Sequence, residues 1–139
     1  MTLVKRDKWG ISHVFADSSA AAFEAQGWVA ADDRIWQMEW DRRRALGRWS
    51  EIVGLAGARE DAFFRRLGIA TIAKNDWNKL DTEAKEMTRS YATGVNRWLD
   101  THVNSLPAEF DYHPEAPEPW EPWHCVAVYK VRHVFMGTL

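Results

Sequence analysis

The feature that most constrains this chain is a long helical pattern within residues 27–54. Side chains that recur at steps of three and four residues share one face of a helix, and here they are Ile35, Met38, Arg42, Ala45 and Leu46. Trp36 and Trp40 form an i,i+4 pair on a neighbouring face. A helix with several large apolar faces cannot lie on a surface. We therefore expect it to be enclosed on most sides, as the central helix of a larger body.

Charge and glycine mark the two ends of this helix. Asp32 and Asp33 lie near its start, and arginines occupy positions 42–44 near its end, which is the order that the helix dipole favours. Gly47 follows, and glycine adopts the left-handed conformation of a helix stop at little cost. The pattern predicts that the helix ends at Gly47.

Composition narrows the classes of protein to consider. The chain has 139 residues, 46% of them hydrophobic, which suits one domain with its own core. A net charge of -2 argues against a nucleic-acid-binding protein. No apolar run is long enough to span a membrane, and residues 1–7 lack the apolar core of a signal peptide. We expect a cytoplasmic protein, or a periplasmic one whose export signal lies outside this sequence.

Tryptophan and cysteine carry two further indications. The nine tryptophans are either large core side chains or the buried centre of an interface with an obligate partner, and the sequence leaves both interpretations open. The single cysteine, Cys125, excludes an internal disulfide and a cysteine metal cluster. On an apolar helix it is expected to be an inert core residue.

The order of elements can be predicted along the whole chain. Residues 3–7 and 11–16 read as two short strands, the second with the pattern of a strand buried in a packed sheet. Residues 17–100 read as helical, with Asp17 or Ser18 and then Asp81 or Thr82 as N-caps. Gly27 indicates a kink or close packing against the central helix, and Gly94 indicates a close helix crossing. Residues 101–121 form a proline-rich loop, and Pro122 begins a last helix over residues 122–139.

Three stretches carry a resemblance to a known family. The first is Gly-Trp-Val-Ala-Ala-Asp-Asp-Arg-Ile-Trp-Gln-Met-Glu at residues 27–39, followed by Arg-Arg-x-Ala-x-Gly-Arg. The second is Tyr-Ala-x-Gly-Val-Asn-x-Trp at residues 91–98, and the third is the Trp-Glu-Pro motif that opens the last helix. Together they resemble the smaller α chain of the penicillin acylase (penicillin amidase) family over essentially the whole chain.

This resemblance implies a fold and a reaction. The fold class is α+β: a mostly helical α chain whose short N-terminal strands complete an αββα sandwich with a β chain. The family is composed of N-terminal-nucleophile hydrolases that cleave N-acyl amides, of β-lactam or acyl-homoserine lactone type. The nucleophile is the N-terminal serine of the β chain, with its own α-amino group as the base. The present serines fit no Gly-x-Ser-x-Gly motif, so the chain is expected to carry no catalytic residue and to be inactive alone.

The resemblance also implies a site and partners. Carried over by ungapped position, the residues of the last helix that line the acyl side of the pocket are His133, Met136 and Gly137. His133 and Gly137 would make that pocket more polar or roomier than one built for a phenylacetyl group. The expected partners are the β chain of the same precursor, in an obligate heterodimer, and a small N-acyl amide substrate. No cofactor or metal ligand is expected in this chain, although a structural calcium is expected in the full enzyme.

The sequence leaves two alternative functions open. The chain could be a non-enzymatic helical module that binds an obligate partner, or a cytosolic enzyme that uses Cys125 with His13, His124 or His133.

Other expectations concern single residues. Arg65 and Arg66 are expected to pair with acidic residues of the central helix, and Asn96 to satisfy backbone groups of the other chain. At position 124 histidine replaces the aspartate usual in the family, which puts the cap of the last helix in question.

Overall fold

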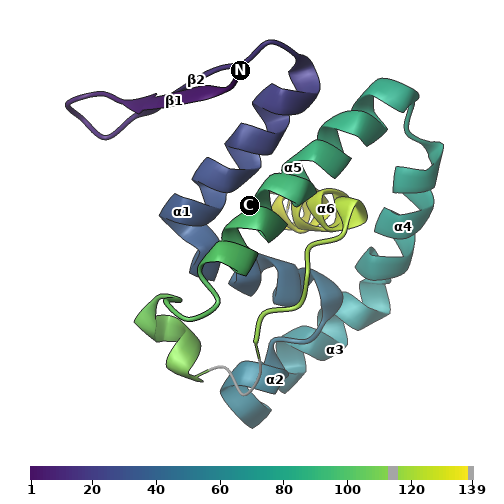
Figure 1. Ribbon diagram of the computed structural model, residues 1–139. Coiled ribbons are helices and arrows are strands. Elements are labelled where there is room, and N and C mark those ends of the chain that lie inside the picture. The colour runs from purple at the N-terminus through teal and green to yellow at the C-terminus, as the bar shows by residue number, and fades with distance from the viewer. Residues whose placement is uncertain (113–115, 138–139) are drawn as a thin grey trace.

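A computed structural model describes residues 1–112 and 116–137, and it is mostly helical with one small antiparallel sheet in that part of the chain (Figure 1). In chain order its elements are β1 (Leu3–Arg6), β2 (Ser12–Phe15), α1 (Ser19–Leu46), α2 (Ser50–Val53), η1 (Gly54–Gly57), α3 (Ala58–Leu67), α4 (Ile69–Lys79), α5 (Thr82–Thr101), η2 (Ala108–Tyr112) and α6 (Pro122–Gly137). The predicted mostly helical character and the two short N-terminal strands are confirmed.

The predicted central helix is the second half of α1. Ser18 caps its start, where the Ser18 hydroxyl accepts the backbone N–H of Ala21 at 3.2 Å. The helix ends at Gly47, whose φ of 63° is the left-handed conformation that the sequence predicted. The one non-helical residue inside α1 is Arg34, with φ −146° and ψ 23°, so the kink lies there and not at Gly27.

α1 and α5 cross at two glycines. A Cβ at Gly94 would lie 1.9 Å from the carbonyl oxygen of Glu24, and one at Gly27 would lie 2.1 Å from the carbonyl oxygen of Tyr91. Either contact would force the two backbones apart, so only glycine permits this approach. The close crossing predicted from Gly94 is confirmed. Gly27 is closely packed, but against Tyr91 of α5 and not against the central helix, because Gly27 and the central helix belong to the same α1.

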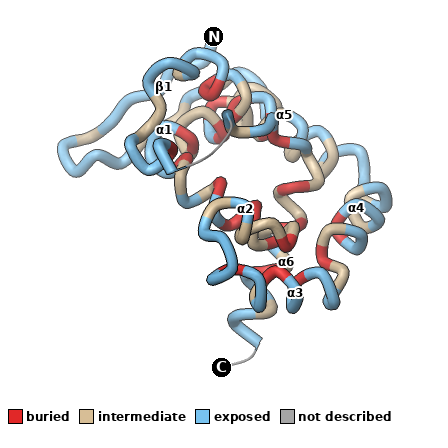
Figure 2. The backbone as a smooth tube through the Cα atoms, turned by 90° about the horizontal axis from the view of Figure 1, so that it is seen from below, coloured by how far each residue is buried: buried red, intermediate tan, exposed pale blue. Residues whose placement is uncertain are grey.

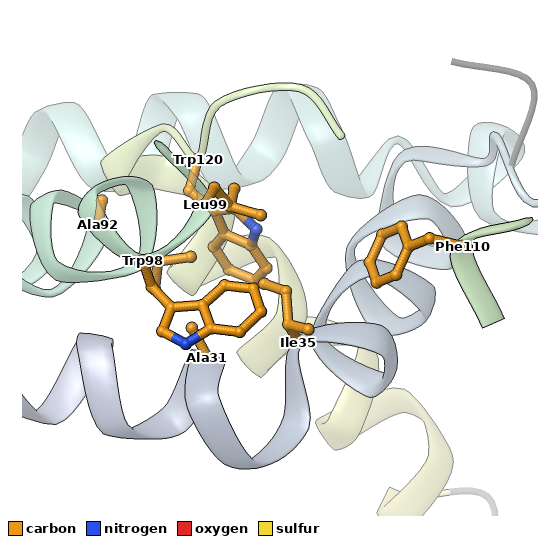
Figure 3. Packing of buried hydrophobic residues seen from close by; sticks show 8 residues of the cluster. Ala31, Ile35, Ala92, Trp98, Leu99, Phe110 and Trp120 are labelled. Atoms are coloured by element: carbon orange, nitrogen blue, oxygen red, sulfur yellow. The ribbon is translucent and has the colours of Figure 1, made fainter. Parts of the chain in front are cut away.

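Two buried clusters hold the helices together. The first joins α1, α5, η2 and the segment before α6, with Ala31, Ile35, Trp98, Phe110 and Trp120 among its members (Figure 3). The second joins the end of α1 to α3, α4 and α6. α6 thus packs on α1 and on α4 at the same time.

The enclosure of α1 is incomplete within this chain. Ile35, Arg42 and Ala45 are buried, as expected of the central face, but Trp40 is exposed and Trp36 is half-buried. Figure 2 shows that buried residues concentrate where the helices meet, whereas the β1–β2 hairpin is pale blue and tan. Among the described residues, no helix has both the length and the apolar character needed to cross a membrane.

A buried charge network runs along the end of α1. The carboxylate of Glu39 accepts from Arg42 at 2.5 Å and from Arg43 at 2.7 Å, and both arginines are buried with it. The predicted pairing of Arg65 with acids of this helix is wrong, because Arg65 Nε donates to the carbonyl of Gly47 at 2.7 Å. The acidic residues near the end of α1 have other partners: Glu39 pairs with Arg42 and Arg43 of the same helix, and Asp41 pairs with Arg132 of α6.

Candidate functional site

The three predicted pocket residues share one face at the far end of α6. His133, Met136 and Gly137 are related by steps of three and four residues, and all three are exposed. Met136 is 77% exposed, and nothing lies within 4 Å of the position that a Gly137 Cβ would take. Figure 2 shows this end of the chain projecting from the helical body. The structure therefore brings the three residues together on an open surface, and their contact with substrate stays a prediction.

His133 has a defined orientation on that surface. Its Nδ1 lies 3.0 Å from the carbonyl oxygen of Tyr129, one turn earlier, and its ring centroid lies 4.2 Å from the Tyr129 ring. Because a carbonyl only accepts, Nδ1 carries the proton in this contact. The other ring nitrogen, Nε2, is then the acceptor that the neutral side chain offers to a ligand.

The opposite end of α6 is fixed by a cap. His124 is the third residue of the helix, and its Nδ1 accepts the backbone N–H of Glu121 at 2.9 Å. This is the backward hydrogen bond of a capping box, made by an imidazole in place of an acidic or amide side chain. Burial lowers the pKa of His124 to about 3, so the ring is neutral and can accept. The departure from aspartate at this position thus keeps the capping role.

The segment just before α6 is held by two side chains from other helices. Asn96 of α5 donates from Nδ2 to the carbonyl of Trp120 at 2.9 Å and accepts the Trp120 N–H at 2.6 Å. Arg42 of α1 donates to the carbonyls of Glu118 at 2.8 Å and Pro119 at 3.1 Å. The expectation that Asn96 binds backbone groups of another chain is wrong, since Asn96 binds the backbone of Trp120 in this chain. The prolines around Trp120 leave the Trp120 backbone without regular partners, and the Asn96 amide supplies both a donor and an acceptor.

The cysteine–histidine alternative gains no support from the geometry. Burial raises the pKa of the Cys125 thiol to about 11, so the thiol stays protonated near neutral pH. His124 uses Nδ1 for the cap, and His13 lies on the hairpin with its Nε2 3.3 Å from Asp7. His133 lies at the exposed end of the same helix, two turns beyond Cys125. These four residues therefore form no common catalytic site.

The β1–β2 hairpin exposes an apolar surface. Its register pairs Leu3 with Phe15 and Arg6 with Ser12, and residues on both strands and the turn remain largely exposed: Leu3, Val4, Trp9, Ile11 and Phe15. Residues 11–16 were predicted to be buried in a packed sheet, and the described residues supply only these two strands, so that burial stays a prediction. A two-stranded hairpin is marginal by itself, so contacts with α1 must hold it.

One basic side chain ties the hairpin to α1. Arg6 donates to Asp33 at 2.7 Å and to Asp32 at 3.0 Å, next to the kink at Arg34. Asp32 also accepts the indole N–H of Trp98 at 3.1 Å, so it connects the hairpin to the core. A groove of about 300 Å³ between β2 and α1 is lined by Ser12, Val14, Ala22, Phe23, Gln26 and Val29.

The tryptophans lie both in the core and on the surface of the described part of the chain, and a role in an interface stays a prediction. Trp98 and Trp120 are buried in the core, whereas Trp9 is 74% exposed. A second groove, of about 400 Å³, is lined almost entirely by apolar side chains: Trp36, Trp40, Trp49, Ile52, Val53 and Tyr112. Such contiguous aromatic surface is typical of a covered interface.

The described residues offer no metal site. Within residues 1–112 and 116–137, no three His, Cys, Asp or Glu side chains come together in a way that would hold an ion. The calcium that the resemblance implies for the full enzyme therefore finds no set of ligands in this part of the chain.

The sequence is similar to a known protein family and to named members of it. The model of the family described as Penicillin amidase matches residues 2–138. The chain is 44% identical over 136 residues to the penicillin acylase 2 proenzyme of Pseudomonas sp. (strain SE83), covering 98% of this chain and 17% of that protein. It is 29% identical over 128 residues to the acyl-homoserine lactone acylase QuiP of Pseudomonas syringae pv. tomato, covering 92% of this chain and 16% of that protein.

A solved structure shows the same fold. The thermostable penicillin G acylase from Alcaligenes faecalis superposes with a TM-score of 0.84 at 27% sequence identity, over 94% of this chain and 70% of that chain. The present chain thus spans about a sixth of the length of the curated relatives it matches, with 17% and 16% for the two named above.

Proposed function

This chain belongs to the penicillin amidase family, and from that premise we propose that it is the α-chain portion of an acylase that cleaves N-acyl amides. The substrates would be of the β-lactam or acyl-homoserine lactone type, because similar proteins are named for both. The reaction breaks the linear amide C–N bond with water, and the products are a carboxylic acid and an amine.

The observation that carries this proposal is the uncovered hairpin. Both strands expose apolar side chains, and the outer edge of each strand keeps backbone groups that another strand can pair with. The Ser12 hydroxyl is buried without a hydrogen-bond partner in the described part of the chain, at the groove between β2 and α1. A second polypeptide that extends this sheet into an αββα sandwich would satisfy all three features.

In this proposal the second polypeptide is the β chain of the same precursor, and it brings the chemistry. Its N-terminal serine hydroxyl attacks the amide carbon, and its α-amino group takes the hydroxyl proton. That amine suits the task because its pKa lies near neutral pH, at about 7.7–8.0 when unperturbed. Donors on the β chain stabilise the oxyanion. The C–N bond then breaks, and the amine leaves with the proton that the α-amino group took up. Water hydrolyses the resulting acyl-enzyme ester and releases the acid.

The role proposed for the present chain is scaffold and acyl-pocket wall. The far end of α6 presents His133, Met136 and Gly137 together on one face, as a wall would require. An acceptor nitrogen on His133 and the space beside Gly137 favour acyl groups that are polar or bulky over a plain phenylacetyl group.

Reconstitution tests the proposal. The chain, the downstream remainder of its precursor, and the two expressed together are each incubated with a panel of N-acyl amides, and amine release is measured. Only the combined preparation is expected to release amine. A stable complex without any hydrolysis would instead support the non-enzymatic partner-binding module, which the exposed tryptophan groove also suits. Hydrolysis by the chain alone would overturn the proposal.

A further inference from the structure

The root of α6, residues 118–121, is held by hydrogen bonds to its main chain. Four hydrogen bonds from Asn96 and Arg42 fix the main chain of residues 118–120, and His124 fixes the main chain of Glu121. Both helices that supply these side chains, α1 and α5, belong to the core. The backbone from which α6 departs is therefore positioned by the main body of the fold.

Toward the far end, the polar contacts of α6 are partly exposed ion pairs. Lys130 pairs with Asp76 at 2.6 Å, and Arg132 pairs with Asp41 at 2.6 Å while its own side chain is 65% exposed. Exposed ion pairs contribute little to fixing a structure. Apolar contacts hold the rest of the helix: Ala127 and Val131 are buried in the second cluster, and the Phe135 ring lies 5.9 Å from the Phe64 ring. Such contacts are non-directional, whereas the hydrogen bonds at residues 118–121 fix the orientation of the peptides from which the helix departs.

Asn96 makes the most specific of the contacts at the root. It binds the N–H and the carbonyl of Trp120 at once, so it fixes the rotation of that peptide as well as its position. The indole of Trp120 is buried in the core beside it, with the Arg42 guanidinium 5.4 Å from the ring centroid. Loss of either hydrogen bond would let the backbone turn while the side chain stays in place.

We propose that Asn96 is a positioning residue that sets which acyl groups the enzyme accepts, through the direction in which α6 leaves Trp120. This inference rests on the acylase function proposed above. His133 lies eleven residues beyond Pro122, which corresponds to about 16 Å along a helix, so a tilt of about 4° at the root moves it by about 1 Å. A misplacement of that size changes how an enzyme site receives its substrate.

The variants are chosen to disturb the peptide of Trp120 without altering the surface. Asn96→Asp keeps the shape and the acceptor but replaces the donor to the Trp120 carbonyl with an oxygen that repels it. Asn96→Ala removes both bonds without adding charge. Asn104→Asp is the matched control, because it makes the same chemical change at an exposed position after α5.

The assay measures kcat/KM of the assembled enzyme for two series of amides: one with a fixed amine and acyl groups of increasing length, one with a fixed acyl group and varied amines. We expect both Asn96 variants to change the ratio between short and long acyl groups by about tenfold, the scale of one methylene in a fitted pocket. The ratios in the amine series and all ratios in Asn104→Asp should stay within about twofold of wild type.

A purely structural role for Asn96 would give a different result. A smaller active fraction lowers kcat/KM equally for every substrate, so unchanged ratios in both series would overturn the positioning role. Failure of both Asn96 variants to assemble would also reject it, because Asn96 would then be needed for the fold itself. If wild-type enzyme cleaves none of the amides, the acylase function fails, and this outcome is distinguishable because it does not depend on any variant.

Discussion

Substitution of Gly94 by alanine should loosen the crossing of α1 and α5. The added Cβ would lie 1.9 Å from the Glu24 carbonyl oxygen and 2.8 Å from the Trp28 nitrogen, both main-chain atoms that cannot rotate away. To restore ordinary contact the two helices must separate by about 1.5 Å, which forfeits much of the dispersion energy across the crossing.

The magnitude follows from two opposing effects. Alanine favours the helix by about 1 kcal/mol over glycine. Overpacking against rigid backbone costs about 3 kcal/mol or more, so we expect a net loss of about 2–3 kcal/mol in local stability. Val95 and Trp98, which are buried beside Gly94, should lose packing with it.

Native-state hydrogen exchange of the assembled protein, read over peptides of α1 and α5, measures this loss directly. Exchange in Gly94→Ala should be about 30- to 150-fold faster than in wild type, since about 1.4 kcal/mol corresponds to a factor of ten. Gly137→Ala is the control, because nothing lies within 4 Å of its Cβ position. If Gly94→Ala exchanges as slowly as wild type, the close backbone contact is not what holds the two helices together.

Three further substitutions test buried groups. His124 has a pKa of about 3 in the folded chain against an ordinary value of 6.5, so the unfolded chain binds the proton more readily. The free energy of unfolding should therefore fall, by up to about 1.4 kcal/mol per pH unit, as pH drops from 6.5 toward 3. In His124→Gln the thermal midpoint should depend less on pH over this range, and an identical pH profile would refute the assignment. Glu39→Gln should destabilise the chain by about 3–5 kcal/mol, because it leaves the buried guanidinium of Arg42 without its counter-charge. The urea midpoint of this variant should lie below that of the control Glu86→Gln, which changes an exposed residue, and equal midpoints would contradict the prediction. Cys125→Ala should leave amide hydrolysis within about twofold of wild type, since a buried, protonated thiol is no nucleophile, whereas loss of turnover with the fold intact would revive a cysteine mechanism.

Features set by local backbone chemistry were predictable from the sequence. The stop at Gly47, the cap at Asp81 and the start of α6 at Pro122 all occur where the residues indicated. Each depends on a few neighbouring residues and on conformations that glycine, aspartate or proline favour. The helix crossing at Gly94 was predictable in the same way. Glycine is unfavourable in the interior of a helix, so its presence there indicates close packing against another element.

Contacts between distant segments were not predictable in the same way. Asn96 pairs with Trp120 and Arg42 with Pro119, across 24 and 77 residues of sequence, and no periodic pattern links those positions. A proline-rich segment with few N–H donors does signal that its carbonyls need partners from elsewhere. The sequence alone does not say which helix supplies them.

The role of the candidate site residues stays a prediction. Ungapped alignment to the family placed His133, Met136 and Gly137 on the last helix, and the structure gathers them at its exposed end. The burial predicted for residues 11–16 stays a prediction, because a strand with this alternation needs a covering layer that the described residues do not contain.

Covalent labelling measures most directly which polypeptide carries the nucleophile. The assembled enzyme is treated with an arylsulfonyl fluoride, which reacts with activated hydroxyl groups, and the intact mass of each chain is recorded together with the remaining activity. If this chain only supports a nucleophile that its partner brings, the partner should gain one sulfonyl group at its N-terminal serine as activity is lost, and the mass of this chain should not change. A sulfonyl group on this chain that rises in step with inactivation would contradict that division of roles.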